Sequence, residues 1–214
     1  MIAERLRAIE ARIDDACATA GRPRSEVRLV AVSKSQPDAQ VIEAYQAGQR
    51  IFGENYVQEL ERHAALFPAG SVEWHVIGHL QTNKAKRAGE LAQLIHSVDS
   101  AKLARALKGR AVLIEVNIGG EEAKAGVAPD AVEALITAIR SDTEVRGLMC
   151  IPPPDDEPRR WFAALRALRD RLRESTGLRL PDLSMGMSGD FEEAILEGAT
   201  WVRVGTALLG ERLA

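Results

Sequence analysis

One lysine at the end of an apolar segment is well suited to covalent chemistry. Lys34 closes the segment 27–34, whose apolar and small residues predict a buried strand, and Pro37 prevents the strand pairing from continuing. Partial removal of an amine from water lowers its pKa, and the neutral amine is a nucleophile towards carbonyl groups. Most lysines at strand ends are instead solvated or ion-paired. The rest of the chain has to decide between these two roles.

Two segments rich in glycine and hydroxyl groups predict a phosphate site. Residues 184–190 read Ser-Met-Gly-Met-Ser-Gly-Asp, residues 204–206 read Val-Gly-Thr, and both lie between an apolar run and a helical pattern. Small residues and backbone N–H groups at the start of a helix bind phosphate. Ser188 and Thr206 could alternatively do no more than cap their helices. The presence of two such segments favours phosphate over capping.

An arginine accompanies the second of these segments. Arg203 lies between two valines in an apolar run, so its side chain should point to the opposite side from theirs. A buried structural ion pair is the alternative role for such an arginine. A lysine able to form a Schiff base, a phosphate site and a residue facing a ring nitrogen together describe a pyridoxal phosphate site.

The histidines do not indicate a metal site. His75 and His79 are four residues apart in a predicted strand, which keeps them at a distance from each other, and no third ligand is nearby. We expect them to line a cavity or brace a loop. His63 and His96 are expected to have no particular role. Tyr56 follows a predicted strand end and could reach the site or only cover a helix start.

Alternating strands and helices predict how these residues are positioned. Eight short apolar runs are each followed by a helical pattern, which is typical of a single-domain (β/α)₈ barrel over residues 1–214. An amphipathic helix over residues 1–20 is expected to pack on the barrel. A doubly wound open sheet is the alternative, although it normally has fewer strands at this length. In a barrel the chemistry lies at the carboxyl ends of the strands. The predicted strands are 29–33, 50–53, 73–77, 94–98, 111–117, 147–151, 183–187 and 201–204, and the helices lie near 38–48, 55–66, 82–90, 101–108, 129–140, 157–175, 190–197 and from 206.

Composition bounds the class of protein. The 214 residues carry a net charge of −3, and the 28% of charged residues are of both signs, which argues against nucleic-acid or membrane-surface binding. Cys17 and Cys150 are far apart and have no metal or redox spacing, which favours a reducing compartment. No apolar run is long enough to span a bilayer. We therefore expect a cytoplasmic protein.

Seven short motifs follow one another along the chain. They are Ala-Val-Ser-Lys at 31–34, Phe-Gly-Glu-Asn-Tyr-Val-Gln-Glu at 52–59, Trp-His-Val-Ile-Gly-His-Leu-Gln-Thr-Asn-Lys at 74–84, Glu-Val-Asn at 115–117, Gly-Leu-Met at 147–149, Leu-Ser-Met-Gly-Met-Ser at 183–188 and Val-Arg-Val-Gly-Thr at 202–206. In this order they resemble the pyridoxal phosphate homeostasis proteins, which are single-domain relatives of the alanine racemase barrel. The resemblance covers essentially the whole chain, and it departs from the family pattern at Ser35, where threonine is frequent, and in a short loop after Ile151.

This resemblance implies a role for each candidate residue. Lys34 would bind the aldehyde of pyridoxal phosphate as a Schiff base, and Arg203 would face the ring nitrogen. Asn55 and Met187 would flank the ring. It further implies a monomer that buffers or delivers the cofactor, with pyridoxal-dependent apo-enzymes as partners and no established turnover. The residues that would hold the phosphate are Ser188, Gly189, Gly205 and Thr206.

Two enzymatic alternatives remain open from the sequence. A weak racemase-like enzyme would need an acid or base opposite Lys34, for which His79 and Tyr56 are candidates. A class I aldolase or sugar-phosphate isomerase would use Lys34 and the phosphate segments without a cofactor. An arginine facing the ring nitrogen disfavours protonation of that nitrogen and weakens the cofactor as an electron sink. This argument favours binding over turnover.

Overall fold

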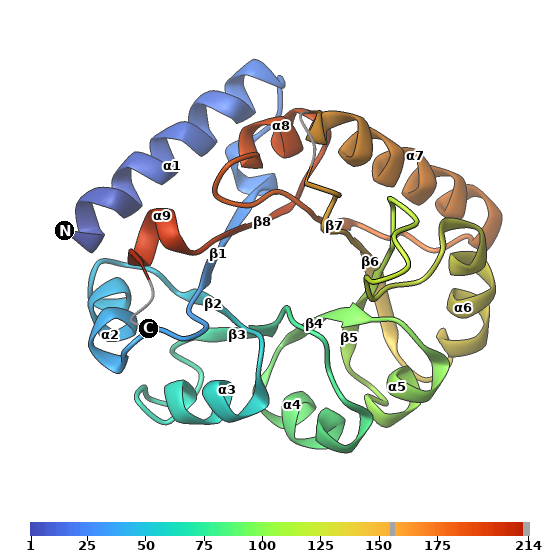
Figure 1. The fold of residues 1–214 in the computed structure, drawn as a ribbon, viewed down its shortest axis with the longest axis horizontal. Coiled ribbons are helices and arrows are strands. Elements are labelled where there is room, and N and C mark those ends of the chain that lie inside the picture. The colour runs from blue at the N-terminus through green and yellow to red at the C-terminus, as the bar shows by residue number, and fades with distance from the viewer. Residues whose placement is uncertain (155–156, 212–214) are drawn as a thin grey trace.

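The structure is a computed structural model that describes residues 1–154 and 157–211. Eight parallel strands form a closed barrel in chain order, and β1 (Arg28–Val32) pairs with β8 (Trp201–Val204) to complete it. Helices surround the barrel (Figure 1). The predicted (β/α)₈ barrel is confirmed, and the alternative of an open sheet is wrong.

The remaining elements follow the predicted order. The strands are β2 (Ile51–Glu54), β3 (Glu73–Val76), β4 (Leu94–Val98), β5 (Ala111–Glu115), β6 (Glu144–Met149) and β7 (Asp182–Ser184). The helices are α1 (Ile2–Thr19), α2 (Asp38–Gln46), α3 (Val57–Ala64), α4 (Ala85–Leu91), α5 (Ala101–Ala106), α6 (Val132–Ile139), α7 (Pro158–Thr176), α8 (Phe191–Leu196) and α9 (Thr206–Leu209).

Strand β7 ends earlier than predicted because the chain turns at Gly186. This glycine has a φ of 88°, a backbone conformation that L residues with side chains rarely adopt. A Cβ at this position would lie 2.6 Å from the Cβ of Ala194 in α8. The turn therefore requires glycine, and it directs residues 187–189 over the end of the barrel.

Alternation along the strands separates two packing layers. In β1, Leu29 and Ala31 pack outwards against the helices, whereas Val30 packs inside the barrel. The interior apolar cluster brings together side chains from five strands that are far apart in sequence. The inward residues nearest the carboxyl ends of the strands are left to form the base of a pocket. The interior cluster consists of Val30, Leu94, Leu113, Met149 and Trp201.

Helix α1 lies outside the barrel beside β1 and β8 and contacts α2, α8 and α9 (Figure 1). Its buried apolar residues occupy one stripe, as the sequence spacing predicts. The Nε of Arg12 donates a hydrogen bond to Glu192 of α8 at 2.6 Å, and Arg22, beyond the helix end, donates to the carbonyl of Ile195 at 2.9 Å. The N-terminal helix thus covers the junction where the barrel closes.

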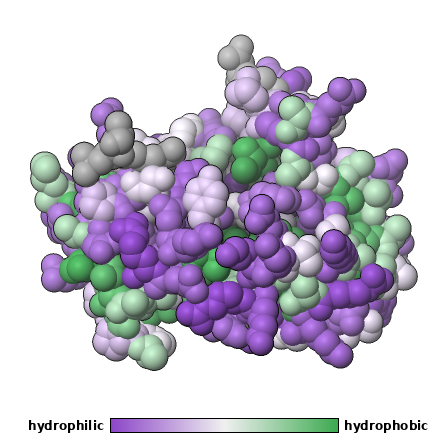
Figure 2. Space-filling model, turned by 60° about the horizontal axis from the view of Figure 1, so that its bottom comes forward, coloured by the Kyte–Doolittle hydropathy of each residue, from purple (hydrophilic) through white to green (hydrophobic). Residues whose placement is uncertain are grey.

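The face of the molecule shown in Figure 2 is mainly hydrophilic, and its hydrophobic residues form small, separate patches. In the described part of the chain, no helix combines the length and the apolar character needed to cross a membrane.

Candidate functional site

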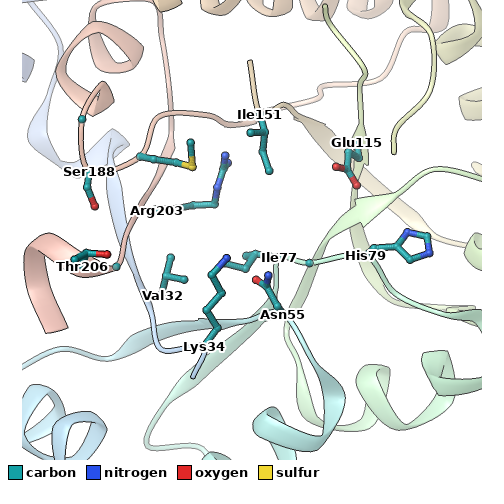
Figure 3. Close-up of a pocket in the computed structure, with 14 residues that line it drawn as sticks. Val32, Lys34, Asn55, Ile77, His79, Glu115, Ile151, Ser188, Arg203 and Thr206 are labelled. Carbon is teal, nitrogen blue, oxygen red and sulfur yellow. The ribbon is translucent and has the colours of Figure 1, made fainter. Parts of the chain in front are cut away.

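A pocket of about 430 Å³ opens at the carboxyl ends of the barrel strands. It contains all eight residues that the sequence analysis singled out for a cofactor, from Lys34 after β1 to Thr206 after β8 (Figure 3). The structure therefore brings together side chains that are up to 172 positions apart, since 206 − 34 = 172. The other lining residues are Val32, Ile77, Gly78, His79, Glu115 and Ile151.

Lys34 is half-buried in the turn that follows β1, and its side chain extends into the pocket (Figure 3). The residues on either side of it are both anchored. The hydroxyl of Ser33 donates to Oε1 of Glu54 at 2.5 Å, and the backbone N–H of Ser35 donates to Oε1 of Glu59 at 2.8 Å. Ser35 has a φ of 57°, which is uncommon for a residue other than glycine. The turn thus fixes the backbone that carries the amine.

A buried glutamate and histidine support this turn. Glu54 and His63 are both fully buried, and Nδ1 of His63 lies 2.6 Å from the Glu54 oxygen that accepts the Ser33 hydroxyl. The expectation that His63 has no particular role is wrong. It lies on the face of α3 that packs on the barrel, where a buried carboxylate needs hydrogen-bond partners.

Arg203 projects from β8 into the barrel and is 4% exposed. Its Nη1 donates to Oγ of Ser184 at 2.6 Å, and its Nη2 donates to the carbonyl oxygen of Cys150 at 3.0 Å. Both partners are neutral, so these bonds are not the structural ion pair considered as an alternative. Burial lowers the pKa of Arg203, although an arginine remains protonated in a folded protein. The two bonds use two of its five N–H donors.

The two hydroxyls predicted to bind phosphate lie on the same side of the pocket (Figure 3). Neither caps a helix, because the N-cap residue of α8 is Asp190 and that of α9 is Gly205. Oδ1 of Asp190 accepts a hydrogen bond from the backbone N–H of Met187 at 2.5 Å and so closes the loop that carries Ser188. The capping alternative for Ser188 and Thr206 is therefore wrong.

A carboxylate that the sequence analysis overlooked lies across the pocket from these hydroxyls. Glu115, the last residue of β5, points into the pocket near His79 (Figure 3). Burial, and next the negative charge of Asp99, raise the pKa of Glu115. Its Oε2 is buried and makes no hydrogen bond with the described residues. Its position two residues after Leu113, on the inward face of β5, was the available signal.

The remaining candidates separate in space. His79 lines the pocket with a side chain that is 61% exposed, whereas His75 is fully buried inside the barrel, so they do not form a metal pair. No cluster of three metal-ligating residues is found within residues 1–154 and 157–211. Tyr56 lies in a neighbouring hollow with Lys84 and outside the pocket. His96 is fully buried and hydrogen-bonded, so the expectation that it has no role is also wrong.

Comparisons with known proteins agree on the family. The alanine racemase N-terminal domain family matches residues 5–213. The chain is 46% identical to the pyridoxal phosphate homeostasis protein of Aquifex aeolicus, over 98% of this chain and 97% of that protein, and 44% identical to that of Pseudomonas aeruginosa, over 99% and 96%. The solved structure of PipY from Synechococcus elongatus with pyridoxal phosphate bound has a TM-score of 0.85 at 38% identity, over 98% of this chain and all of that one. The chain therefore belongs to the pyridoxal phosphate homeostasis proteins, within the alanine racemase N-terminal domain family.

Proposed function

We propose that this protein binds pyridoxal phosphate reversibly through Lys34 and thereby buffers or delivers the cofactor, without turnover of a substrate. The observation that carries the proposal is the convergence of an amine, a guanidinium group and two hydroxyls in one pocket. The names of the relatives and the PipY structure with pyridoxal phosphate support it.

The pocket fits the cofactor in size and in chemistry. Its volume of about 430 Å³ is in the range of small-molecule sites. Val32, Ile77 and Ile151 supply apolar walls for a ring, and Asn55 and Met187 flank it. At the phosphate side, Gly189 leaves open space, since a Cβ there would meet no atom within 4 Å. An anionic group could therefore approach the backbone between Ser188 and Thr206.

When bound, pyridoxal phosphate supplies an aldehyde that condenses with a primary amine, releases one water and is freed again by hydrolysis. Lys34 supplies the amine, and the anchored residues on each side of it hold its backbone at the pocket. Arg203 places a permanent cation and spare N–H donors within the pocket. A donor of this kind favours an unprotonated ring nitrogen.

Racemase-like turnover is a second candidate because the structure places a carboxyl group with a raised pKa across the pocket. A raised pKa brings a carboxyl group closer to the range in which a second acid or base works. Incubation of the loaded protein with single amino-acid enantiomers tests this. Racemisation at an enzyme-like rate that is lost in Glu115→Gln would replace the carrier role.

The proposal extends to the setting in which the protein works. We propose a cytoplasmic monomer that hands the cofactor to pyridoxal-dependent apo-enzymes. Cys17 and Cys150 are both free and buried, which fits a reducing compartment. Size-exclusion chromatography with light scattering tests the monomer, and reactivation of an apo-enzyme by the loaded protein tests delivery.

The decisive experiment is spectroscopic. Protein mixed with pyridoxal phosphate should turn yellow, and borohydride should fix the cofactor on the peptide that contains Lys34, as mass spectrometry can verify. Lys34→Ala should abolish both signals. Lys84→Ala is the matched control, because Lys84 lies in the neighbouring hollow and not in the pocket. Fixation on any other residue of the wild-type protein would refute the proposal.

A further inference from the structure

A continuous chain of hydrogen bonds crosses the interior of the barrel below the pocket. It begins at Arg203, whose Nη1 lies 2.6 Å from Oγ of Ser184. The same oxygen lies 2.8 Å from Nδ1 of His96, and Nε2 of His96 lies 2.9 Å from Nδ1 of His75. The chain ends where Nε2 of His75 meets Oε1 of Glu73 at 3.0 Å. It therefore links β8, β7, β4 and β3 from the pocket to the opposite end of the barrel.

The charge at each end determines which atom donates along the whole chain. The Glu73 carboxylate can only accept, so Nε2 of His75 carries a hydrogen and donates to it. A neutral His75 then accepts at Nδ1 from the Nε2–H of His96. A neutral His96 in turn accepts at Nδ1 from the Ser184 hydroxyl, whose oxygen accepts from Arg203. One tautomer of each histidine satisfies all four bonds, and both rings are neutral.

Burial holds this arrangement in place. His75, His96 and Ser184 are fully buried, and the rings of Trp201 and His75 pack in a T-shaped arrangement with centroids 4.8 Å apart. Desolvation by burial lowers the pKa of His75 and lowers that of His96 well below its usual value. Both pKa shifts favour the neutral rings that the bonding pattern requires.

Further charged groups face this chain from the strands around it. Arg28 of β1 and Asp182 of β7 act on His75, and Arg28 and Arg146 of β6 act on Glu73. Arg146 is itself paired with Asp182 at 2.7 Å. The Glu73 end of the hydrogen-bond chain, which lies away from the pocket, therefore has both positively and negatively charged side chains as neighbours.

We infer that Ser184, His96 and His75 are positioning residues that orient the guanidinium of Arg203 towards the pocket. Among residues 1–154 and 157–211, Arg203 has no carboxylate as a hydrogen-bond partner, and its guanidinium is oriented by Ser184 and by the carbonyl of Cys150. The histidines fix the Ser184 hydroxyl, because rotation of that hydroxyl would break its bond to His96. The effect on cofactor binding rests on the proposed function, whereas the hydrogen-bond pattern does not.

The pattern is tested first in the protein without cofactor. Ring ¹⁵N chemical shifts should show His75 and His96 neutral at pH 7, each with its hydrogen on Nε2. Ser184→Ala removes the donor to His96 and should shift the Nδ1 resonance of His96 while its hydrogen stays on Nε2, because His75 still accepts from it. Glu73→Ala removes the acceptor of His75 and should produce a mixture of tautomers, and it provides an independent variant if Ser184→Ala does not fold. A hydrogen on Nδ1 of either wild-type histidine would overturn the inference.

Cofactor binding is tested with the same variants and with Met149→Leu, a volume-conserving control in the same interior cluster. Ser184→Ala should weaken pyridoxal phosphate binding by about tenfold, since Arg203 loses an acceptor, and should shift the pH dependence of the bound absorption band. Met149→Leu should change neither. If the wild type binds the cofactor and Ser184→Ala leaves both properties unchanged, the inference is wrong. If the wild type does not bind it, the proposed function fails instead.

Discussion

The two cationic residues of the pocket are held in opposite ways. Lys34 lies in a turn whose neighbouring residues are anchored through a serine hydroxyl and a backbone N–H, while its own four-carbon side chain reaches into the pocket. Arg203 lies on a regular strand, and its own guanidinium is held by Ser184 and Cys150. The turn at Lys34 fixes the backbone, whereas the barrel interior fixes the arginine side chain itself.

This difference agrees with the role of each residue in the proposed function. A lysine that bonds reversibly to a carbonyl group has to change the geometry of its amine, which a flexible side chain on a firm backbone permits. An arginine that faces a ring needs a constant orientation, which packing and hydrogen bonds provide. Breaking each support separately should therefore have different consequences.

The largest expected effect comes from the support below Lys34. Glu54→Ala leaves His63 buried without the carboxylate that is hydrogen-bonded to its Nδ1, although Asp38 remains 3.6 Å from its Nε2, and removes the acceptor of the Ser33 hydroxyl. We expect a loss of about 3–5 kcal/mol in the free energy of unfolding, as for other broken buried pairs. Urea denaturation monitored by circular dichroism measures it. Glu90→Ala, which removes an exposed carboxylate on α4, should cost far less. Equal losses would show that the Glu54–His63 pair contributes no more to the free energy of unfolding than an exposed carboxylate does.

Arg203→Ala should affect binding more than attachment. Loss of a charged hydrogen bond to the cofactor should cost about 2–3 kcal/mol of binding free energy and alter the absorption band. The remaining bound cofactor should still be fixed by borohydride, because Lys34 is intact. Lys34→Ala should instead remove the covalent attachment, so that borohydride fixes no cofactor on the protein. An unchanged dissociation constant in Arg203→Ala would show that the guanidinium does not face the ligand.

A smaller effect is expected at the phosphate side. The double variant Ser188→Ala with Thr206→Ala should lose about 1.5–3 kcal/mol of binding free energy for pyridoxal phosphate. Pyridoxal, which lacks the phosphate, should bind the variant and the wild type equally. Titration of both compounds by absorbance separates these cases. Unchanged affinity for pyridoxal phosphate would mean that the phosphate lies elsewhere.

The smallest effect is on pH dependence. His75 and His96 have pKa values below 6.5 in the folded protein, because burial favours their neutral forms. Between those values and 6.5 the unfolded chain binds more protons, so the free energy of unfolding should fall as the pH drops below about 6.5. Urea midpoints between pH 7.5 and 5.5 measure this slope. The raised pKa of Glu115 acts in the opposite direction.

A histidine variant assigns that slope. His96→Asn should flatten it, because the variant lacks one of the two buried imidazoles. A slope that is unchanged in His96→Asn would show that His96 does not contribute to it.

Much of the site could be predicted from local pattern. Alternation in β8 predicted that Arg203 points opposite to the valines beside it, and the structure has it inside the barrel while Val202 and Val204 pack outside. The carboxyl ends of the strands indicated which residues would meet, since parallel strands bring those ends to one side of a barrel. For this reason Lys34, Ser188 and Thr206 could be grouped although they lie on different loops.

Interior contacts could not be predicted in the same way. Period-two alternation shows which face a side chain takes, but the register between strands decides which inward side chains meet. The pairing of β4 with β5 shifts between Ile95 and Val98, so His96 could not be aligned from its own strand. His63 and Glu54 come from a helix and a strand. Glu115 was not predicted as a site residue because the strand was expected to extend to residue 117, whereas β5 ends at Glu115.

The sequence by itself determined the barrel fold, the end of the barrel at which the pocket lies, and the identity of the amine and the arginine. These features depend on periodicity and residue type within short stretches of the sequence. Only the tertiary structure decided how Lys34 and Arg203 are supported. Those supports include hydrogen bonds between side chains as many as 88 positions apart, as between His96 and Ser184. Such bonds depend on closure of the barrel, which excludes water from its interior and leaves these polar groups only one another as partners.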